Sequence, residues 1–349
     1  MKKFFIAAVP LAAVLALGGC SSTPERPTSD TSSLIVINSL SEPNASDSRN
    51  NSSSDASGVQ ANVSFSGDRV ITENRTVAEG QVLTVRNGET LYINDGAEFT
   101  VDGGIAVENG GSIKVRSGGS LLLNGKMTLD GGLELGGFLG IREKGEINGA
   151  GLLTVLNSFD DIDCKGTCKA KIKAPEPVEK DGVTYVGGVL IVNKKYSVPE
   201  DYGEELGLVI DEAYDQLLKM REDTGFDMPL VSGYRSYWTQ DDLFNYYCEI
   251  DDYDKVVMYS AEPGHSEHQT GLAMDLGQIT EDYVNTEEGG WLTDNCHKYG
   301  FIIRYPKGCE KKTGYDYEPW HVRWLGESTA RLVRDSGLTL EEFLGVEAM

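Results

Sequence analysis

The sequence is poor in positive charge. Its 349 residues include 31 Lys and Arg against 55 Asp and Glu, which gives a formal net charge of −24 at pH 7. A surface of this sign repels the phosphate backbone of nucleic acids, so we expect no nucleic-acid partner. It also repels an anionic membrane surface, so any attachment to a membrane has to be covalent or helical.

Cysteine is also scarce, and the cysteines lack the spacing of a metal cluster. Cys164 and Cys168 in "CKGTC" could close a small loop, whereas Cys248, Cys296 and Cys309 leave an odd number. No second closely spaced pair exists to complete a four-cysteine metal site. The sequence therefore favours a structural disulfide or free thiols over a cysteine-bound metal.

The amino-terminal segment has the features of an export signal. Lys2 and Lys3 precede the apolar run "FFIAAVPLAAVLALGGC", which ends at Cys20. A basic start, an apolar stretch and small residues before a cut are typical of a secretory signal, and "LGGC" resembles the bacterial lipobox. A transmembrane anchor is the alternative, but the run is marginal for spanning. We expect residues 1–19 to be a lipoprotein signal peptide, Cys20 to carry the lipid, and the protein to be extracytoplasmic and anchored to the bacterial cell membrane.

Residues 20–64 are rich in Ser, Asn, Asp, Thr and Pro and contain few large apolar residues. A stretch such as "NASDSRNNSSSDASG" cannot bury a core and predicts disorder. A flexible coil of about 40 residues typically reaches roughly 35 Å. We therefore interpret this segment as a tether between the lipid and the domains that follow.

Residues 65–157 carry a repeat in which short alternating strands are separated by glycine turns. Segments such as "TLYI", "EFTV" and "SIKV" recur every seven or eight residues. This pattern predicts an all-β, solenoid-like domain whose units bury their apolar faces by stacking, and a β-sandwich is the alternative. We expect a spacer, because few aromatic residues project from the repeat to bind glycans. Residues 158–179 are predicted to be a linker.

Residues 180–349 have the mixed pattern of an α+β domain. The segment "EELGLVIDEAYDQLLKMRED" has apolar residues at helical spacing, and "FIIRY" is typical of a strand. Ser236 is placed to cap a helix over "SYWTQDDLFNYYCEI". Thr339 and Glu342 form the pattern of a capping box for the last helix.

Two segments of this domain, "GHSEHQTGLAMDL" and "YEPWH", contain three of the four histidines of the chain. A catalytic zinc site needs three protein ligands and an open position, and His268, Asp275 and His321 offer such a set. Taken singly, each histidine is more often a surface or core residue than a ligand. Asp275 lies in an apolar strand, where a carboxylate is costly unless it is paired or bound to metal. The donor set favours Zn²⁺, although other divalent ions fit less specifically.

Glu318, three residues before His321, is the candidate general base. On an ideal strand, positions three apart face opposite sides of the sheet. Pro319 interrupts the strand, so a bulge or twist is needed to bring Glu318 to the metal. Glu267 and His265, which lie close to His268 in the sequence, are expected to be solvated.

The segments "SGYRSYWTQ", "PGHSEHQTGLAMD" and "YEPWH" together resemble the VanY-type D-alanyl-D-alanine carboxypeptidases, which are zinc peptidases that trim peptidoglycan stem peptides. The resemblance covers roughly residues 180–349 and implies an α+β zinc peptidase domain. It implies that zinc is bound by His268, Asp275 and His321, and that Glu318 acts as the general base. It also implies that the substrate is contacted by Arg235, Gln240 and Ser266.

The chemistry of the predicted substrate agrees with this resemblance. A carboxypeptidase must hold a free terminal carboxylate, and the guanidinium of Arg235 offers a planar fork for it. The resemblance thus predicts removal of a terminal D-alanine from stem peptides. The alternatives are L,D-carboxypeptidase action on tetrapeptide stems, D,D-dipeptidase action, a cell-wall-binding surface protein and a plain structural surface protein.

Overall fold

The structure is a computed structural model, and it describes residues 61–64 and 67–349. The predicted signal peptide, the lipid on Cys20 and most of the predicted tether lie outside the described residues. Within the described part of the chain, no helix has the length and apolarity needed to cross a membrane.

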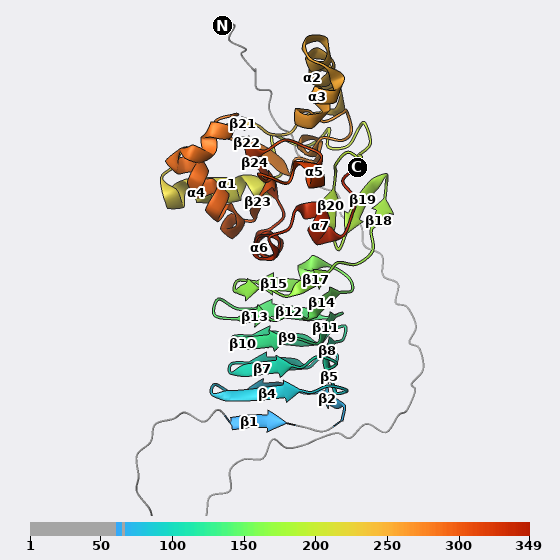
Figure 1. The fold of residues 1–349 in the computed structure, drawn as a ribbon, viewed down its shortest axis with the longest axis vertical. Coiled ribbons are helices and arrows are strands. Elements are labelled where there is room, and N and C mark those ends of the chain that lie inside the picture. The colour runs from blue at the N-terminus through green and yellow to red at the C-terminus, as the bar shows by residue number, and fades with distance from the viewer. Residues whose placement is uncertain (1–60, 65–66) are drawn as a thin grey trace, which may run out of the picture. The chain divides into compact units, whose positions relative to one another are not determined.

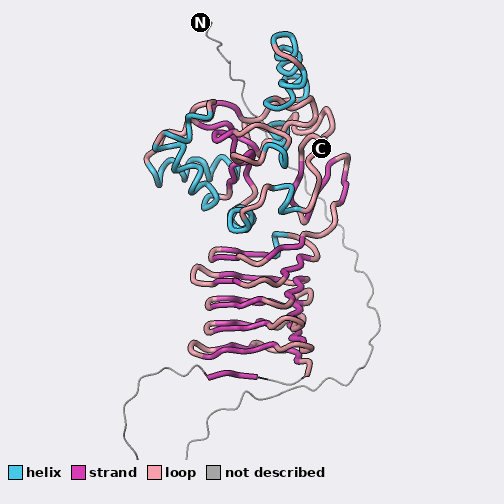
Figure 2. The backbone as a smooth tube through the Cα atoms, in the orientation of Figure 1, coloured by secondary structure: helices cyan, strands magenta, loops and turns pink. Residues whose placement is uncertain are grey.

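The amino-terminal part of the described chain is a β-solenoid built from three parallel sheets (Figure 2). In each sheet every third strand of the sequence is a neighbour, so three strands make one coil. The first sheet contains β1 (Ala61–Ser64), β4 (Gln81–Val85), β7 (Gly104–Val107), β10 (Lys126–Leu129), β13 (Glu146–Asn148) and β16 (Thr167–Cys168). The second contains β2 (Arg69–Ile71), β5 (Thr90–Ile93), β8 (Ser112–Val115), β11 (Gly132–Leu135), β14 (Leu152–Val155) and β17 (Lys171–Lys173). The third contains β3 (Arg75–Val77), β6 (Glu98–Val101), β9 (Ser120–Leu123), β12 (Phe138–Ile141) and β15 (Ile162–Cys164).

Stacked apolar side chains fill the solenoid. Leu91 pairs with Ile113, and Ile113 with Leu133, so the same inward position recurs in successive coils. All three side chains are buried, as the alternation of a half-buried strand requires. Glycine is needed where coils approach closely, because a Cβ at residue 103 would lie 2.3 Å from two backbone carbonyl oxygens of the preceding coil.

The solenoid is longer than the predicted span of residues 65–157. It begins with β1, which pairs with β4, and it ends with β17. The predicted linker over residues 158–179 therefore contains β15, β16, β17 and a short helix, η1 (Phe159–Asp161). These last strands have two or three residues each and lack the regular glycine spacing, so the repeat is not visible there in the sequence.

The carboxy-terminal domain has the predicted α+β composition. A small antiparallel sheet of β18 (Val178–Lys180), β19 (Val183–Val186) and β20 (Val189–Ile191) precedes it. Its central antiparallel sheet has the order β21 (Leu230–Ser232), β22 (Ala273–Leu276), β24 (Glu318–Trp324) and β23 (Phe301–Tyr305). The helices, labelled in Figure 1, are α1 (Asp211–Thr224), α2 (Tyr237–Ile250), α3 (Tyr253–Tyr259), α4 (Glu287–Asn295), α5 (Glu310–Thr313), α6 (Glu327–Ser336) and α7 (Leu340–Leu344). Three short helices are η2 (Glu267–Thr270), η3 (Glu281–Asn285) and η4 (Cys296–Tyr299).

Helix α1 forms the core of this domain with the central sheet. Its buried face, with Leu217 and Met220, belongs to one apolar cluster with Met274 of β22 and Val322 of β24. The helix ends at Gly225, whose φ of 73° is the left-handed conformation typical of a helix end. The predicted caps of α2 at Ser236 and of α7 at Thr339 are both present.

The last coil of the solenoid shares an apolar core with α6 and α7. The ring of Phe159 lies 5.2 Å from that of Phe343, measured between centroids. Two backbone N–H groups of the coil donate to helix α6, from Cys164 to the hydroxyl of Ser328 at 2.9 Å and from Cys168 to the carboxylate of Asp335 at 2.8 Å. The end of the solenoid is therefore covered by apolar packing, and the two domains are not joined by a free linker.

Cys164 and Cys168 face this shared core as free thiols. Burial raises the pKa of Cys164 to about 12 and that of Cys168 to about 11. The other three cysteines of residues 67–349 are free as well. Of the two predicted alternatives, the structure thus has thiols and no disulfide within the part it describes.

Candidate metal centre and active site

A tight turn brings His268 close to Asp275. His268 lies in η2, which ends at Gly271 with a φ of 70°, and the chain then enters β22. A Cβ at Gly271 would lie 2.9 Å from the side chain of Leu206, so both the conformation and the space favour glycine. The turn places the imidazole Nε2 of His268 3.3 Å from Oδ2 of Asp275.

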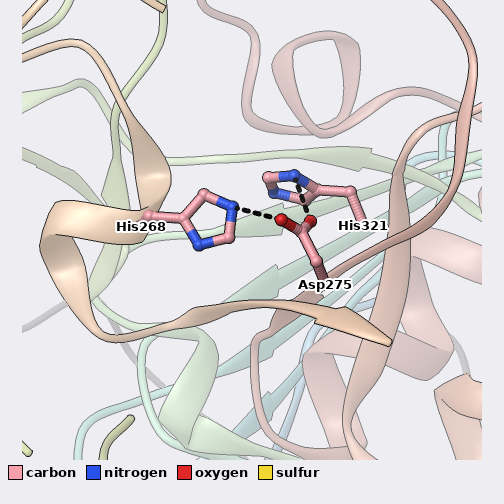
Figure 3. A group of neighbouring side chains, drawn as sticks. All are labelled: His268, Asp275 and His321. Carbon is pink, nitrogen blue, oxygen red and sulfur yellow. Dashed lines mark ion pairs between the residues drawn. The ribbon is translucent and has the colours of Figure 1, made fainter. Parts of the chain in front are cut away.

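The antiparallel pairing of β22 with β24 adds the third residue. Asp275 is the direct cross-strand partner of His321, and directly opposed side chains on one face are close neighbours. Nδ1 of His321 lies 3.4 Å from Oδ1 of Asp275. One potential ligand atom from each of the three residues lies within 4.8 Å of the others (Figure 3).

The hydrogen bonds of these residues fit a zinc ion. Nδ1 of His268 lies 2.7 Å from the carbonyl oxygen of Gly233 and donates to it, which leaves the lone pair of Nε2 for a metal. Oδ1 of Asp275 is buried and accepts no hydrogen bond from any described residue. Two imidazoles and one carboxylate are a common donor set for catalytic zinc, so the residues present fit this ion.

Glu318 reaches the same place through a bulge. Ile303 pairs with Val322 and Tyr305 with Glu318, so β24 has two more residues than β23 over this stretch. The bulge that the three-residue spacing requires is thus present, next to Pro319. It brings Oε2 of Glu318 within 3.2 Å of Nδ1 of His321.

Arg235 follows the end of β21 by three residues and lines the same pocket. Its guanidinium donates to Oγ of Ser232 at 3.0 Å and to Oε1 of Gln240 at 2.7 Å. Gln240 is completely buried, and its amide donates to the carbonyl oxygen of Ala261 at 2.6 Å. The geometry favours a positioning role for Gln240, since it does not line the pocket. Ser266 does line the pocket.

The charged groups of the site shift one another's pKa. Burial alone would raise the pKa of Asp275, but His268 and His321 hold it below its ordinary value. Burial alone would lower the pKa of His321, but the carboxylates of Glu267 and Glu318 raise it to about 9. Without a metal, the site therefore holds a positive charge on His321 near neutral pH.

The pocket around these residues has a volume of about 460 Å³. Its wall is rich in tyrosine, including Tyr247 of α2 and Tyr259 of α3, whose ring centroids lie 5.3 Å apart. Sequence reasoning did not find these tyrosines, because α2 resembles an ordinary amphipathic helix. They add aromatic surface to a pocket whose lining also contains the charged groups.

Glu267 differs most from the prediction. It was expected to be solvated, but it is 1% exposed and its carboxylate binds both Arg304 and Arg323. The two arginines follow Glu267 by 37 and 56 residues, so no local pattern indicated them. His265 is half-buried, with Nδ1 2.8 Å from the carbonyl oxygen of Asn193, and is not the freely solvated residue expected. His297 lies in η4 outside the site, and burial lowers its pKa to about 4.

The family profile described as VanY, D-alanyl-D-alanine carboxypeptidase, matches residues 204–327. This part of the chain belongs to the VanY family. It contains all of the site residues described above, whereas the solenoid lies outside the match.

Two curated relatives cover the same region. YodJ of Bacillus subtilis is 40% identical over 179 residues, which are 44% of this chain and 65% of YodJ. A D-alanyl-D-alanine carboxypeptidase of Enterococcus faecium is 34% identical over 113 residues, 32% of this chain and 35% of the relative. The chain thus spans less than two thirds of the length of either relative.

Solved structures of both specificities are similar in sequence to this region. The LD-carboxypeptidase LdcB is 36% identical, with a TM-score of 0.44 over 49% of this chain and 94% of that chain. A VanY D,D-pentapeptidase in complex with Zn(II) is 29% identical, with a TM-score of 0.39 over 44% of this chain and 97% of that chain.

Proposed function

We propose that the carboxy-terminal domain is a zinc-dependent carboxypeptidase that removes the terminal D-alanine from peptidoglycan stem peptides. One observation carries the proposal: three potential zinc ligands, a carboxylate 3.2 Å from one of them and a guanidinium share one pocket. Membership of the VanY family supports the substrate class.

His268, Asp275 and His321 would hold the zinc ion. Zinc held there would polarise the scissile carbonyl and make a water molecule more acidic. Glu318 accepts a proton from that water and delivers it to the leaving amine, a role for which a carboxylate beside the ligand set is well placed. The burial of Asp275 and His321 keeps both side chains fixed as the reaction proceeds.

Arg235 would bind the terminal carboxylate of the peptide. Ser232 and Gln240 hold two of its nitrogens, so the guanidinium keeps one orientation on the pocket wall. A planar, permanently charged fork recognises a carboxylate through paired hydrogen bonds. Arg235 thereby selects for a free chain end and sets its distance from Glu318. Ser266 adds a neutral hydroxyl on the same wall.

Incubation of the zinc-loaded full chain with two stem peptides tests the proposal. One is a pentapeptide that ends in D-Ala-D-Ala, and the other is the tetrapeptide that remains after one alanine is lost. Mass spectrometry detects the loss of alanine from each peptide. Loss of one alanine from the pentapeptide would establish D,D-carboxypeptidase activity, which we propose. Loss from the tetrapeptide would assign L,D-specificity, and survival of both peptides would contradict a stem-peptide carboxypeptidase.

We also propose that the chain is a lipoprotein held outside the bacterial cytoplasmic membrane by Cys20. The "LGGC" sequence and the basic, then apolar, segment before it support this location. The solenoid would then hold the peptidase domain away from the membrane. Metabolic labelling with a radioactive fatty acid should mark the wild-type protein and not a Cys20→Ala variant. Equal labelling of both would contradict the anchor.

A further inference from the structure

The two carboxylate oxygens of Glu267 have different surroundings. Its oxygen Oε1 accepts from Nε of Arg304 and from Nη1 of Arg323, each at 2.7 Å. Its other oxygen, Oε2, is buried and accepts from no group in residues 67–349. Buried carboxylate oxygens without a donor are costly, so this one needs a partner.

The atom that faces Oε2 is Nε2 of His321, at 3.7 Å. This nitrogen is also buried and has no hydrogen-bond partner in the same part of the chain. Two unsatisfied polar atoms thus face each other slightly beyond hydrogen-bond distance. A small rotation of the imidazole would join them and satisfy both.

From this geometry we infer that Glu267 is the positioning residue that makes His321 a zinc ligand through Nδ1. A carboxylate oxygen can only accept, so it favours the tautomer that carries its proton on Nε2. The lone pair then lies on Nδ1, the nitrogen that faces Asp275 and Glu318. The inference rests on the proposed zinc site, and it names a function for a residue outside the proposed ligand set.

In His268, the hydrogen bond from Nδ1 leaves the other ring nitrogen, Nε2, available for the metal. A backbone carbonyl, that of Gly233, accepts this hydrogen bond. The two histidines would therefore ligate through different nitrogens, each selected by an acceptor on the far side of the ring. Such acceptors fix both the tautomer and the orientation of a ligating histidine.

The surrounding charges hold Glu267 in place. Arg304 also donates from Nη1 to the carboxylate of Glu341 in α7 at 3.0 Å, and Arg323 donates from Nη2 to the carbonyl oxygen of Leu190 at 2.6 Å. Both guanidinium groups are buried, with 0% and 1% exposed. The two arginines thus fix one carboxylate oxygen of Glu267, and the other oxygen is available as an acceptor for His321.

A Glu267→Gln variant tests the inference. The two arginines would retain the amide oxygen, so the amide NH₂ would face Nε2 of His321. That donor favours a proton on Nδ1, the nitrogen needed for the metal. We expect zinc affinity, measured by competition with a chelating indicator, to fall by about 10–100-fold. The visible spectrum of the cobalt-substituted protein should change as well.

Glu341→Gln is the matched control. It makes the same chemical change on the same arginine, at a side chain of 2% exposure, without facing His321. We expect this variant to lose stability but to keep wild-type zinc affinity and the wild-type cobalt spectrum. Equal loss of zinc affinity in both variants would show a structural role only and would overturn the inference, as would wild-type affinity in Glu267→Gln.

Glu267→Asp decides the question if Glu267→Gln does not fold. It keeps the charge between the arginines but withdraws the carboxylate from His321. We expect it to weaken zinc binding in a protein whose circular dichroism in chelator is native, and wild-type affinity would overturn the inference. If wild-type protein releases alanine while the Glu267 variants bind zinc normally, the positioning role alone is wrong. A wild type that binds no zinc would overturn both this role and the proposed function.

Discussion

The solenoid and the carboxy-terminal domain bury very different side chains. Among the buried polar and charged residues of the described chain, Glu89 alone belongs to the solenoid, and the others lie at or beyond residue 193. Glu89 accepts a hydrogen bond from a backbone N–H in its own turn. The carboxy-terminal domain instead buries two arginines, two histidines and three carboxylates, and four of these seven side chains line the site pocket. Repeated apolar side chains thus form the core of the solenoid, whereas the carboxy-terminal domain buries charged side chains, which are costly to bury, at its candidate active site.

The largest expected effect concerns the charged region. Replacement of Glu318 by Gln removes the proton acceptor but keeps the shape of the site. We expect kcat for alanine release to fall by about 10²–10⁴-fold, the usual contribution of a general base. Steady-state assays by mass spectrometry measure this loss. Zinc content should remain at the wild-type level, and a variant with unchanged kcat would show that Glu318 is not the base.

The second largest effect is expected in the core that the solenoid shares with α6 and α7, where the two regions are in contact. Replacement of Phe343 by Ala would remove a buried ring that packs on Phe159 of the solenoid. We expect the free energy of unfolding to fall by about 3–5 kcal/mol, measured by denaturant titration. We expect zinc affinity in the folded variant to stay at the wild-type level, because Glu341, which α7 also carries, binds Arg304 and does not face His321.

Leu121→Ala in the middle of the solenoid is the control for this variant. Leu121 is completely buried but lies in β9, remote in the sequence from the shared core. We expect a loss of about 2–5 kcal/mol with wild-type zinc affinity in the folded protein. Wild-type zinc affinity in both variants would show that the solenoid and the metal centre are independent.

The smallest effect is the pH dependence of zinc binding. The carboxylates around His321 raise its pKa to about 9 in the metal-free protein, so zinc must displace a proton at neutral pH. Affinity should therefore rise about tenfold per pH unit below 9 and level off above it, since one proton is released per ion. Competition titrations between pH 6.5 and 9.5 measure the slope. An affinity that is constant over this range would contradict a protonated His321.

Sequence reasoning succeeded where the pattern is local. The glycine period predicted the solenoid, because every coil repeats the same short strand and the same turn. The residue types of His268, Asp275 and His321, with the resemblance to a family, indicated a metal set. The three-residue step from Glu318 to His321 correctly required a bulge or twist in β24. Each of these features depends on residues close in the sequence or on a resemblance to a family.

Sequence reasoning failed where distant residues meet. Glu267 has its partners Arg304 and Arg323 on other strands, and without the fold a glutamate in a glycine-rich turn is most simply solvated. The last strands of the solenoid were taken for a linker, because α6 and α7 supply their packing from far along the chain. In both cases the packing partner lies far along the chain, and in the last strands the regular glycine spacing is absent as well.

Removal and return of the metal tests whether alanine release depends on zinc. The full chain would be treated with a chelator, dialysed, and assayed on the D-Ala-D-Ala pentapeptide before and after addition of one equivalent of zinc. We expect no alanine release from the metal-free protein and recovery of the original rate with zinc. Full activity in the chelator-treated protein, with no zinc detected by elemental analysis, would contradict it.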